Sequence, residues 1–418
     1  MGLNKRDSNL FRERHRRKHT RLDVRDLNRV IAIDTENQLA RVEGMTPYDA
    51  VVDAALPHGL MPCVVPELKS ITVGGAISGV GIESSSFKYG FVHETVETMD
   101  ILLSDGRVVT ATKTNEYHDL FFGFPNSYGT LGYILSAVIR LIPVKPFVKL
   151  THIRFNDIEE YFNTVKSRCR ESYDFIDGVV FAEKELYLTL GQFTDSAPYT
   201  SDYTAMQIYY KSIRTRDTDY LSTRDYIWRW DSDWFWCSRV FGVQHPLIRA
   251  LFGKRILNSR FYMKLGRINK RLQFLSTIKK LFRIQTESII QDVEVPIEHA
   301  ADYLRFQLKV IPVTPVWICP MQSTAQQFDL YITKPESLYI NFGFWQIIKS
   351  THPAGYFNKL IEEKVETLRG RKSLYSESYY PEEKFWELYN KEAYFTLKEK
   401  YDKRGMFKNL YQKCVLKR

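Results

Sequence analysis

Cysteine is scarce in this chain of 418 residues, and a long apolar run is missing. The cysteines are odd in number, widely scattered and never in a CxxC pair: Cys63, Cys169, Cys237, Cys319 and Cys414. This pattern argues against a disulfide framework or a zinc site and favours reduced thiols, so no metal is expected. The uncharged run from Val310 to Phe328 holds three prolines and a polar end, which excludes a transmembrane helix there. With no signal-peptide pattern at the N-terminus, we expect a cytoplasmic protein that is soluble or peripheral at a membrane.

Two common nucleotide-binding motifs and internal repeats are also missing. Residues 79–81 (GVG) begin like the dinucleotide motif G-x-G-x-x-G, but Ser84 stands where its third glycine belongs. Residues 253–254 (GK) resemble the end of a P-loop, but Arg255 replaces the serine or threonine that must follow. Neither a Rossmann dinucleotide site nor a P-loop is therefore supported.

The composition is that of a large folded protein with a basic surface. Hydrophobic residues make up 44% of the chain and aromatic residues 14%, far too much apolar surface for a disordered chain. The length predicts two domains. The formal net charge of +10 favours anionic partners, such as nucleic acid, anionic lipid or a phosphate-bearing ligand.

Strand and helix patterns along the chain predict a mixed α+β fold. Residues 100–110 predict two strands joined by an Asp-Gly turn. Further strands are predicted over residues 131–143, 304–316 and 338–346. The tail from Pro381 to Cys414 is helix-forming. A change in the residue pattern at residues 145–146 predicts a domain boundary there.

The most informative stretch is residues 66–90, PELKSITVGGAISGVGIESSSFKYG, which combines five glycines with a block of hydroxyl side chains. Glycine lets the backbone approach a ligand closely because it has no Cβ. Consecutive backbone N–H groups form a nest for a phosphate, and serine and threonine hydroxyls complete its shell. A glycine-rich connection between strands, with no ligand, explains the texture equally well.

This glycine segment (residues 66–90) resembles the FAD-binding signature of the vanillyl-alcohol-oxidase superfamily, also called the PCMH type. Within that superfamily the resemblance is greatest to Δ24-sterol reductases and their bacterial relatives. Other stretches resemble the same family in the same order: RVEGMTPYDAV (41–51), ETMDILLSDGRVV (97–109), residues 119–150, PVWICP (315–320), ESYYPEEKFWELYN (377–390) and LKEKYDKRGMFKNLY (397–411). The resemblance covers nearly the whole chain and is weakest over 151–290.

The resemblance implies an FAD-dependent oxidoreductase of two domains. Residues 1–146 would form the PCMH-type FAD-binding domain, residues 147–365 a substrate or cap domain, and residues 366–418 a tail that returns to the FAD domain. The implied FAD contacts lie in two segments. They are Pro66, Thr72, Val73, Gly74, Gly75, Gly79, Gly81, Ile82, Glu83, Ser84, Ser85, Ser86, Tyr89 and Gly90, followed by Gly129, Gly132 and Ile134.

Two departures from the family pattern concern the front of the chain. The family's flavin domain starts with a further strand pair and a phosphate-binding turn, and here only residues 5–12, with Ser8 and Asn9, resemble that turn. Some superfamily members link FAD covalently through a histidine of this turn, but His15 and His19 read better as parts of a solvated basic arm. The membrane anchor of eukaryotic Δ24-sterol reductases is not recognised either.

Flavin-dependent reduction of a C=C bond needs a hydride at one carbon and a proton at the other. Tyr375 and Tyr379 match tyrosines of the sterol-reductase pattern, and Glu377 lies between them. We predict that Tyr379 donates the proton, with Tyr375 and Glu377 as the other candidates. The alternative is an aromatic packing cluster with Phe385 and Trp386. His93 reads better as a structural histidine, and Lys88 is a candidate cation for the flavin.

Residues 249–283, the basic segment, carry eleven Lys or Arg and no acidic residue, interleaved with apolar residues. A basic amphipathic helix of this kind suits an anionic membrane surface, from which a lipid-like substrate would be drawn. A helical cap with solvated cations is the alternative. No nucleic-acid motif accompanies the charge, so nucleic acid is not expected.

The leading functional hypothesis is an FAD-dependent reductase acting on a C=C bond of a sterol or isoprenoid lipid, with NADPH as the electron donor. The second keeps the fold but reverses the chemistry, as an oxidase or dehydrogenase of an alcohol, a sugar or a lipid-linked sugar. The third is a flavin-free binding protein, which the short front of the chain favours.

Overall fold

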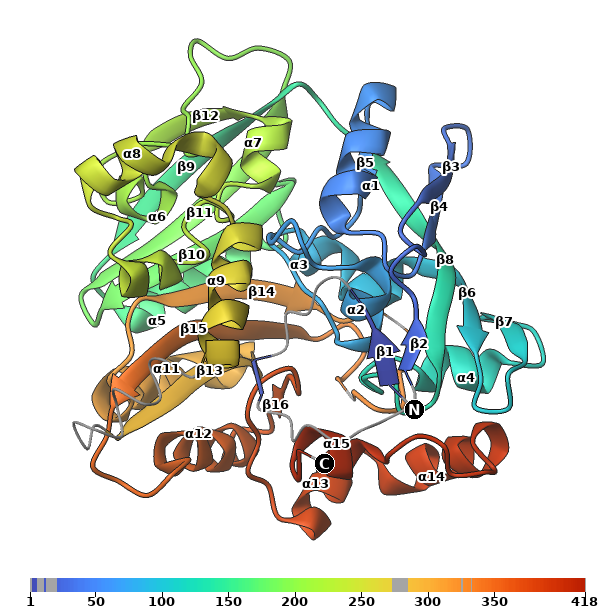
Figure 1. Cartoon of the computed structure of the whole chain (residues 1–418). Helices are drawn as coiled ribbons and strands as arrows, with labels where there is room; N and C mark the ends of the chain where they lie inside the picture. The colour runs from blue at the N-terminus through green and yellow to red at the C-terminus, as the bar shows by residue number, and fades with distance from the viewer. Residues whose placement is uncertain are drawn as a thin grey trace.

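Two large antiparallel sheets organise the chain in its computed structural model, which describes residues 2–5, 11–12, 21–272, 285–324, 326–331 and 333–417. The six-stranded sheet has the order β3-β4-β8-β6-β7, with β5 beside β8. Its strands are β3 (Val30–Asp34), β4 (Leu39–Glu43), β5 (Leu60–Pro62), β6 (Val96–Leu102), β7 (Val108–Thr112) and β8 (Tyr133–Pro143). A separate parallel pair, β1 (Gly2–Asn4) and β2 (Arg21–Asp23), lies near its lower edge in Figure 1.

The eight-stranded sheet has the order β12-β9-β11-β10-β14-β15-β13-β16 and lies beside the first sheet (Figure 1). Its strands are β9 (Phe147–Phe155), β10 (Phe175–Ala182), β11 (Glu185–Thr194), β12 (Thr218–Ser222), β13 (Thr286–Pro296), β14 (Val316–Gln322), β15 (Leu338–Lys349) and β16 (Arg371–Lys372). The chain passes from one sheet to the other between Pro143 and Phe147. The fold is therefore α+β, as the sequence predicts.

The helices are short and lie around the two sheets. They are α1 (Tyr48–Ala55), α2 (Val73–Ser78), α3 (Ser86–Tyr89), α4 (His118–Gly123), α5 (Ile158–Arg168), α6 (Tyr209–Ser212), α7 (Thr223–Ile227), α8 (Pro246–Ile256), α9 (Ser259–Leu272), α11 (Ala300–Val310), α12 (Tyr356–Thr367), α13 (Glu382–Leu388), α14 (Lys391–Tyr401) and α15 (Leu410–Cys414). The tail helices α13, α14 and α15 return beneath the six-stranded sheet (Figure 1). No helix in the described parts of the chain is long and apolar enough to cross a bilayer.

Alternation along β10 gives the eight-stranded sheet two different faces. Phe175 and Val179 belong to a core that also holds the six-stranded sheet and the tail, whereas Ile176 and Val180 pack with α5 and α11. Successive side chains of a strand point to opposite faces, so this strand is buried on both sides. One face of the large sheet therefore meets the rest of the molecule, and the other carries its own helices.

Most predicted strands are confirmed, but the prediction for residues 304–316 is wrong. That region is the helix α11 up to Val310, and β14 begins only at Val316. The alternation of Leu304, Phe306, Leu308 and Val310 with polar residues imitates a strand. The buried side chains instead follow helical spacing: Ala300, Ala301, Tyr303, Leu304 and Gln307. The predicted Asp-Gly hairpin is confirmed as β6 and β7, and the strand over 131–143 as β8.

Candidate active site

The glycine segment contains a short helix, α2, whose start is fixed by Thr72. The Thr72 hydroxyl accepts a hydrogen bond from the Gly75 amide, which caps the helix. The Gly74 amide donates to the Gly44 carbonyl at 2.9 Å, and a Cβ on Gly74 would lie only 2.8 Å from that oxygen. Gly74 therefore serves the close approach of α2 to the end of β4, while Gly75 faces solvent.

The serine block after α2 is held by bonds within the protein. Ser84 donates to the Glu83 carboxylate at 2.6 Å, Ser85 to the Cys63 carbonyl at 2.7 Å, and the Ser86 hydroxyl accepts from the Glu83 amide. All three serines are buried. These hydroxyls fix the backbone path of the segment, and their contact with FAD stays a prediction.

The second predicted flavin segment lies directly against the first. A Cβ on Gly79 would meet the Tyr128 ring at 3.5 Å, and the Tyr128 hydroxyl donates to the Gly79 carbonyl at 3.3 Å. Asn126, Tyr128 and Gly129 all have positive φ, so the chain turns sharply here. The tail clamps this turn, because the Lys413 ammonium donates to the carbonyls of Tyr128 and Gly129.

The remaining predicted contacts form the support of these segments. Val73 is fully buried, a Cβ on Gly81 would touch Pro66, and a Cβ on Gly90 would meet the Glu94 carboxylate. Gly132 and Ile134 lie at the start of β8, where a Cβ on Gly132 would meet the Leu102 carbonyl at 2.8 Å. The Ile134 carbonyl is packed against Gly44, whereas Ile82 and Tyr89 are half-buried.

Among the described residues, buried hydrogen-bond donors and acceptors next to Tyr128 lack partners, as a site for a polar ligand requires. Arg12 is 2% exposed and lies 5.0 Å above the Tyr128 ring. Within the described residues its Nε and Nη2 atoms have no hydrogen-bond partner, nor do Asn126 Oδ1 and Ser127 Oγ. A buried guanidinium fork and a serine hydroxyl beside a glycine turn fit a phosphate or a flavin carbonyl, and the Asn126 oxygen fits an N–H group of a ligand. The residues present therefore fit FAD.

A buried cluster of three carboxylates around Arg229 joins the glycine segment to the eight-stranded sheet. The Arg229 guanidinium lies 2.8 Å from Glu67, 3.2 Å from Glu83 and 2.8 Å from Asp177 of β10. Trp317 of β14 also donates to Asp177 at 3.2 Å. Burial raises the pKa of Glu67 well above its usual range and also raises the pKa of Glu83. Burial therefore favours the neutral forms of these carboxyl groups.

The tail brings Tyr375 to the point where both sheets and the Tyr128 turn meet, a region called the junction here. Trp345 of β15 donates to the Tyr375 hydroxyl at 2.9 Å, and Asp292 of β13 lies close enough to Tyr375 to interact with it electrostatically. Burial raises the pKa of Asp292 to about 6 and keeps the Tyr375 pKa well above its usual value. Beside them, the Tyr331 hydroxyl donates to Glu294, whose pKa burial raises to about 8.

Tyr379 and Glu377, the other predicted catalytic residues, have different surroundings. The Tyr379 ring lies beside α12, because a Cβ added to Gly355 would collide with it. The Lys359 ammonium lies 5.9 Å from the centre of the ring. The Glu377 carboxylate forms an ion pair with Lys417. The structure therefore brings Tyr375, and not these two side chains, to the Tyr128 turn.

Three other sequence predictions concern His93, Lys88 and the front of the chain. His93 is buried, stacks on Phe91, and has its pKa lowered to about 3 by burial, as a structural histidine would. Lys88 pairs with Asp174 at 3.4 Å on the surface. The front-turn residues Ser8 and Asn9, and His15 and His19, lie outside the described residues.

The basic segment is partly a packed cap. Arg249 is buried and pairs with Asp233 at 2.6 Å, and Arg260 pairs with Asp49 of α1 at 2.6 Å. Large apolar side chains are nevertheless exposed on α8, with Leu247 at 75% and Leu251 at 80%. Residues 273–283 of this segment lie outside the described residues.

The comparisons with known proteins agree with this geometry. The FAD binding domain family matches residues 6–112. Delta(24)-sterol reductase of Homo sapiens is 30% identical over 402 residues, which cover 92% of this chain and 75% of the relative. The enzyme of the same name from Arabidopsis thaliana is 26% identical, covering 95% of this chain and 77% of the relative. Decaprenylphosphoryl-beta-D-ribose oxidase of Mycolicibacterium smegmatis is 34% identical over 125 residues, 30% of this chain and 27% of the relative.

A PCMH-type FAD-binding domain with a second sheet and a returning tail defines an FAD-dependent oxidoreductase. Within that class the chain belongs to the Δ24-sterol reductase family. Sequence reasoning did not single out Arg12, Arg229 or Asp292. The chain holds 59 Lys and Arg and 49 Asp and Glu, and nothing in the sequence distinguishes the few that are buried together.

Proposed function

We propose that the protein reduces a C=C bond of a sterol or another isoprenoid lipid, with NADPH as the electron donor. The observation that carries this proposal is the extent of the similarity to sterol reductases, which continues from the glycine segment through the eight-stranded sheet into the tail. The substrate of the proposed reaction is an alkene lipid, and its product is the saturated lipid.

The proposed flavin site lies between the glycine segment and the Tyr128 turn. Gly75, Gly79 and Gly129 would leave room for the cofactor, and Arg12 would place a cation beside its phosphates or its N1–C2=O edge. When bound, FAD would take up the electrons of NADPH and supply them as a hydride. Residues 1–146 and 366–418 would form this domain, and residues 147–365 the cap over it.

Tyr375 is the proton donor that the geometry favours over Tyr379. Its hydroxyl accepts the Trp345 N–H, a bond that also stabilises the phenolate left after the proton has moved to a substrate carbon. Asp292 lies close to the Tyr375 hydroxyl and would offer a route for its reprotonation. Tyr375 lies in the tail next to Arg12, because its carbonyl accepts the Phe11 amide.

We propose that α8 contacts an anionic membrane surface, from which a lipid substrate is drawn. Leu247 and Leu251 are one helical turn apart, so both exposed side chains lie on one face of α8. The overall net charge of +10 favours such a surface. The ion pairs of Arg249 and Arg260 are consistent with a packed base beneath this exposed face.

An anaerobic titration of the purified protein tests the proposed reaction. We expect a flavin absorbance spectrum that NADPH bleaches and that an alkene sterol restores, whereas the same sterol with a saturated side chain does not. Bleaching by an alcohol or a lipid-linked sugar without NADPH would instead favour an oxidase or dehydrogenase. The partial similarity to decaprenylphosphoryl-beta-D-ribose oxidase is the observation behind that second candidate.

A further inference from the structure

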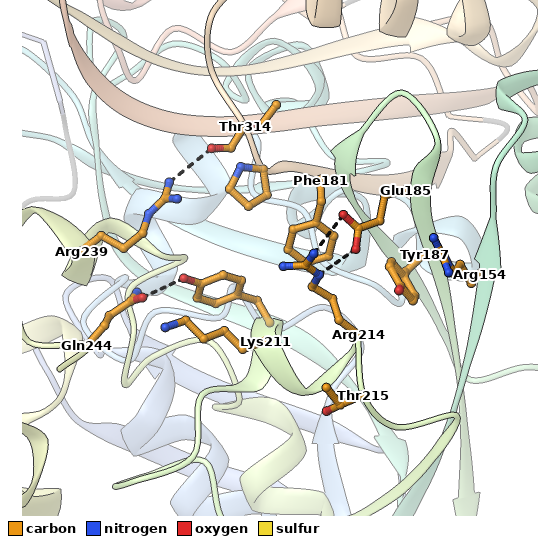
Figure 2. A pocket seen from close by; sticks show the side chains of 12 residues that line it. Arg154, Phe181, Glu185, Tyr187, Lys211, Arg214, Thr215, Arg239, Gln244 and Thr314 are labelled. Atoms are coloured by element: carbon orange, nitrogen blue, oxygen red, sulfur yellow. Dashed lines mark hydrogen bonds and ion pairs between the residues drawn. The ribbon is translucent and has the colours of Figure 1, made fainter. Parts of the chain in front are cut away.

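A cation-rich pocket of about 840 Å³ lies at the edge of the eight-stranded sheet, apart from the junction (Figure 2). Arg154 of β9, Phe181 of β10 and Tyr187 of β11 line it from the sheet, and Lys211 lines it from α6. Asp177 and Phe181 are four residues apart on one face of β10, which is roughly 13 Å along a strand. The volume is in the range of pockets that hold small-molecule ligands.

The charges of the pocket are strongly unbalanced. Its cations are Arg154, Lys211, Arg214 and Arg239, and its one carboxylate is Glu185. Arg214 already neutralises that carboxylate through two bonds of 2.7 and 3.1 Å, so Glu185 would not repel an anion. Within the described residues neither Arg154 nor Lys211 has a carboxylate within ion-pair distance. The free cations therefore select an anionic ligand.

The wall of the pocket is aromatic. The Phe181 and Tyr210 rings are nearly parallel, with centres 6.4 Å apart, and Tyr187 meets Phe181 edge to face. The Arg214 guanidinium lies 5.0 Å above Phe181, and Figure 2 shows Arg214, Lys211 and Arg239 arranged around that ring. Gln244 accepts a hydrogen bond from the Tyr210 hydroxyl, and its own amide group donates to Ser238. Flat rings and guanidinium groups provide stacking surfaces for a planar group.

We infer that this pocket binds a nucleotide, with its phosphates on Arg154 and Lys211, which have no carboxylate partner among the described residues, and its base against the aromatic wall. The combination of unpaired cations with flat apolar rings matches a ligand that is polyanionic at one end and planar at the other. The pocket is a second ligand site, separate from the flavin site. The inference does not depend on the proposed substrate, because it requires no reaction.

Calorimetric titration of the FAD-loaded protein with ADP tests this assignment, with pyrophosphate and adenosine titrated in parallel. We expect one ADP per chain, bound at least about tenfold more tightly than either fragment, because phosphate and ring contacts are both used. Equal affinity for pyrophosphate would overturn the nucleotide assignment. Binding should also weaken as salt concentration rises.

Single substitutions locate the site. Lys211→Ala and Arg154→Ala should each weaken ADP binding by about tenfold, through loss of one charge-assisted contact. Lys149→Ala is the matched control, because Lys149 is an exposed cation on the other face of β9 and should leave binding unchanged. Glu185→Gln should tighten binding, because Arg214 becomes free to face the phosphates.

Two results would overturn the proposal. The first is ADP binding that is the same in Lys211→Ala and Arg154→Ala as in the unchanged protein, because the nucleotide would then occupy another site. The second is slower flavin reduction by NADPH in these variants at equal flavin content, which would make the pocket part of the donor site. Failure of the alkene reaction itself would leave the ADP result unaffected.

Discussion

The glycine segment and the basic segment are equally conspicuous in the sequence, yet the structure uses them very differently. The glycine segment makes close backbone contacts, such as that of Gly74 with Gly44, that leave few alternatives for each residue. In the basic segment, Arg249 and Arg260 form ion pairs within the protein. Leu247 and Leu251 are exposed. A residue pattern thus predicts a site best where backbone geometry, rather than charge, restricts the residue types.

Among the predicted effects, substitution of Gly74 should have the largest. A small effect would contradict the difference drawn between the glycine segment and the basic segment. Gly74→Val places a Cβ about 2.8 Å from the Gly44 carbonyl, a backbone atom that cannot move aside. We expect loss of bound flavin and destabilisation of roughly 3 kcal/mol or more. Flavin content and the melting temperature measure this.

Gly75→Ala is the matched control for Gly74→Val. Gly75 faces solvent, and its Cβ would meet only the movable Thr72 hydroxyl. This variant should fold normally. A Gly74→Val protein that retained full flavin would remove the argument that close backbone contact defines the glycine segment.

The second prediction concerns Tyr375, the residue of the tail that lies near the Tyr128 turn. Tyr375→Phe should slow reoxidation of the reduced protein by an alkene sterol by about 100-fold or more, because the proton donor is lost. Reduction by NADPH should stay unchanged. Stopped-flow absorbance separates the two half-reactions, and Tyr379→Phe, which should be near normal, is the control. Equal effects of both variants would refute the choice of Tyr375.

The third prediction concerns the exposed face of α8. Replacing Leu247 and Leu251 together by serine should reduce sedimentation with anionic vesicles by at least about tenfold, since full burial of each leucine would contribute roughly 1.5–3 kcal/mol. Val108→Ser, at another exposed apolar position, should have no effect. Unchanged vesicle binding in the double variant would assign α8 to the packed cap alone.

The smallest expected effect is on pH dependence at the junction. Burial raises the pKa of Glu294 to about 8, so its protonated form stabilises the fold fully below pH 4.5, and this contribution is lost as pH rises toward 8. Glu294→Gln should reduce the fall in melting temperature between pH 5 and pH 8 by a few degrees. The exposed Glu298→Gln is the control. An identical slope in both variants would contradict a buried, neutral Glu294.

The sequence predicts local structure well where the pattern has one reading. The Asp-Gly turn between β6 and β7 and the proline at the end of β8 both lie where the sequence predicts them. Residues 304–310 have two readings, because apolar residues at every second position also lie on a helix that buries only some of them. Tertiary packing decides between the two, and a single sequence does not contain that information in readable form.

The candidate site likewise has one part that the sequence predicts and one part that it does not. The glycine segment carries its own signature, so its family is recognisable. The junction is assembled from Arg12, Tyr128, Asp292 and Tyr375, which lie far apart in the chain and meet only when the tail returns. The serine block shows the limit of residue type alone, because its hydroxyls bond within the protein.

The Arg229 cluster makes the contact between the two sheets sensitive to acidity. Three carboxylates surround one guanidinium, and burial raises the pKa of Glu67, so the buried arrangement favours its protonated form. If water reached Glu67, its pKa would fall toward its ordinary value and the proton would be held less tightly. Opening of this seam is therefore coupled to deprotonation, and acidic conditions hold the two halves of the molecule together.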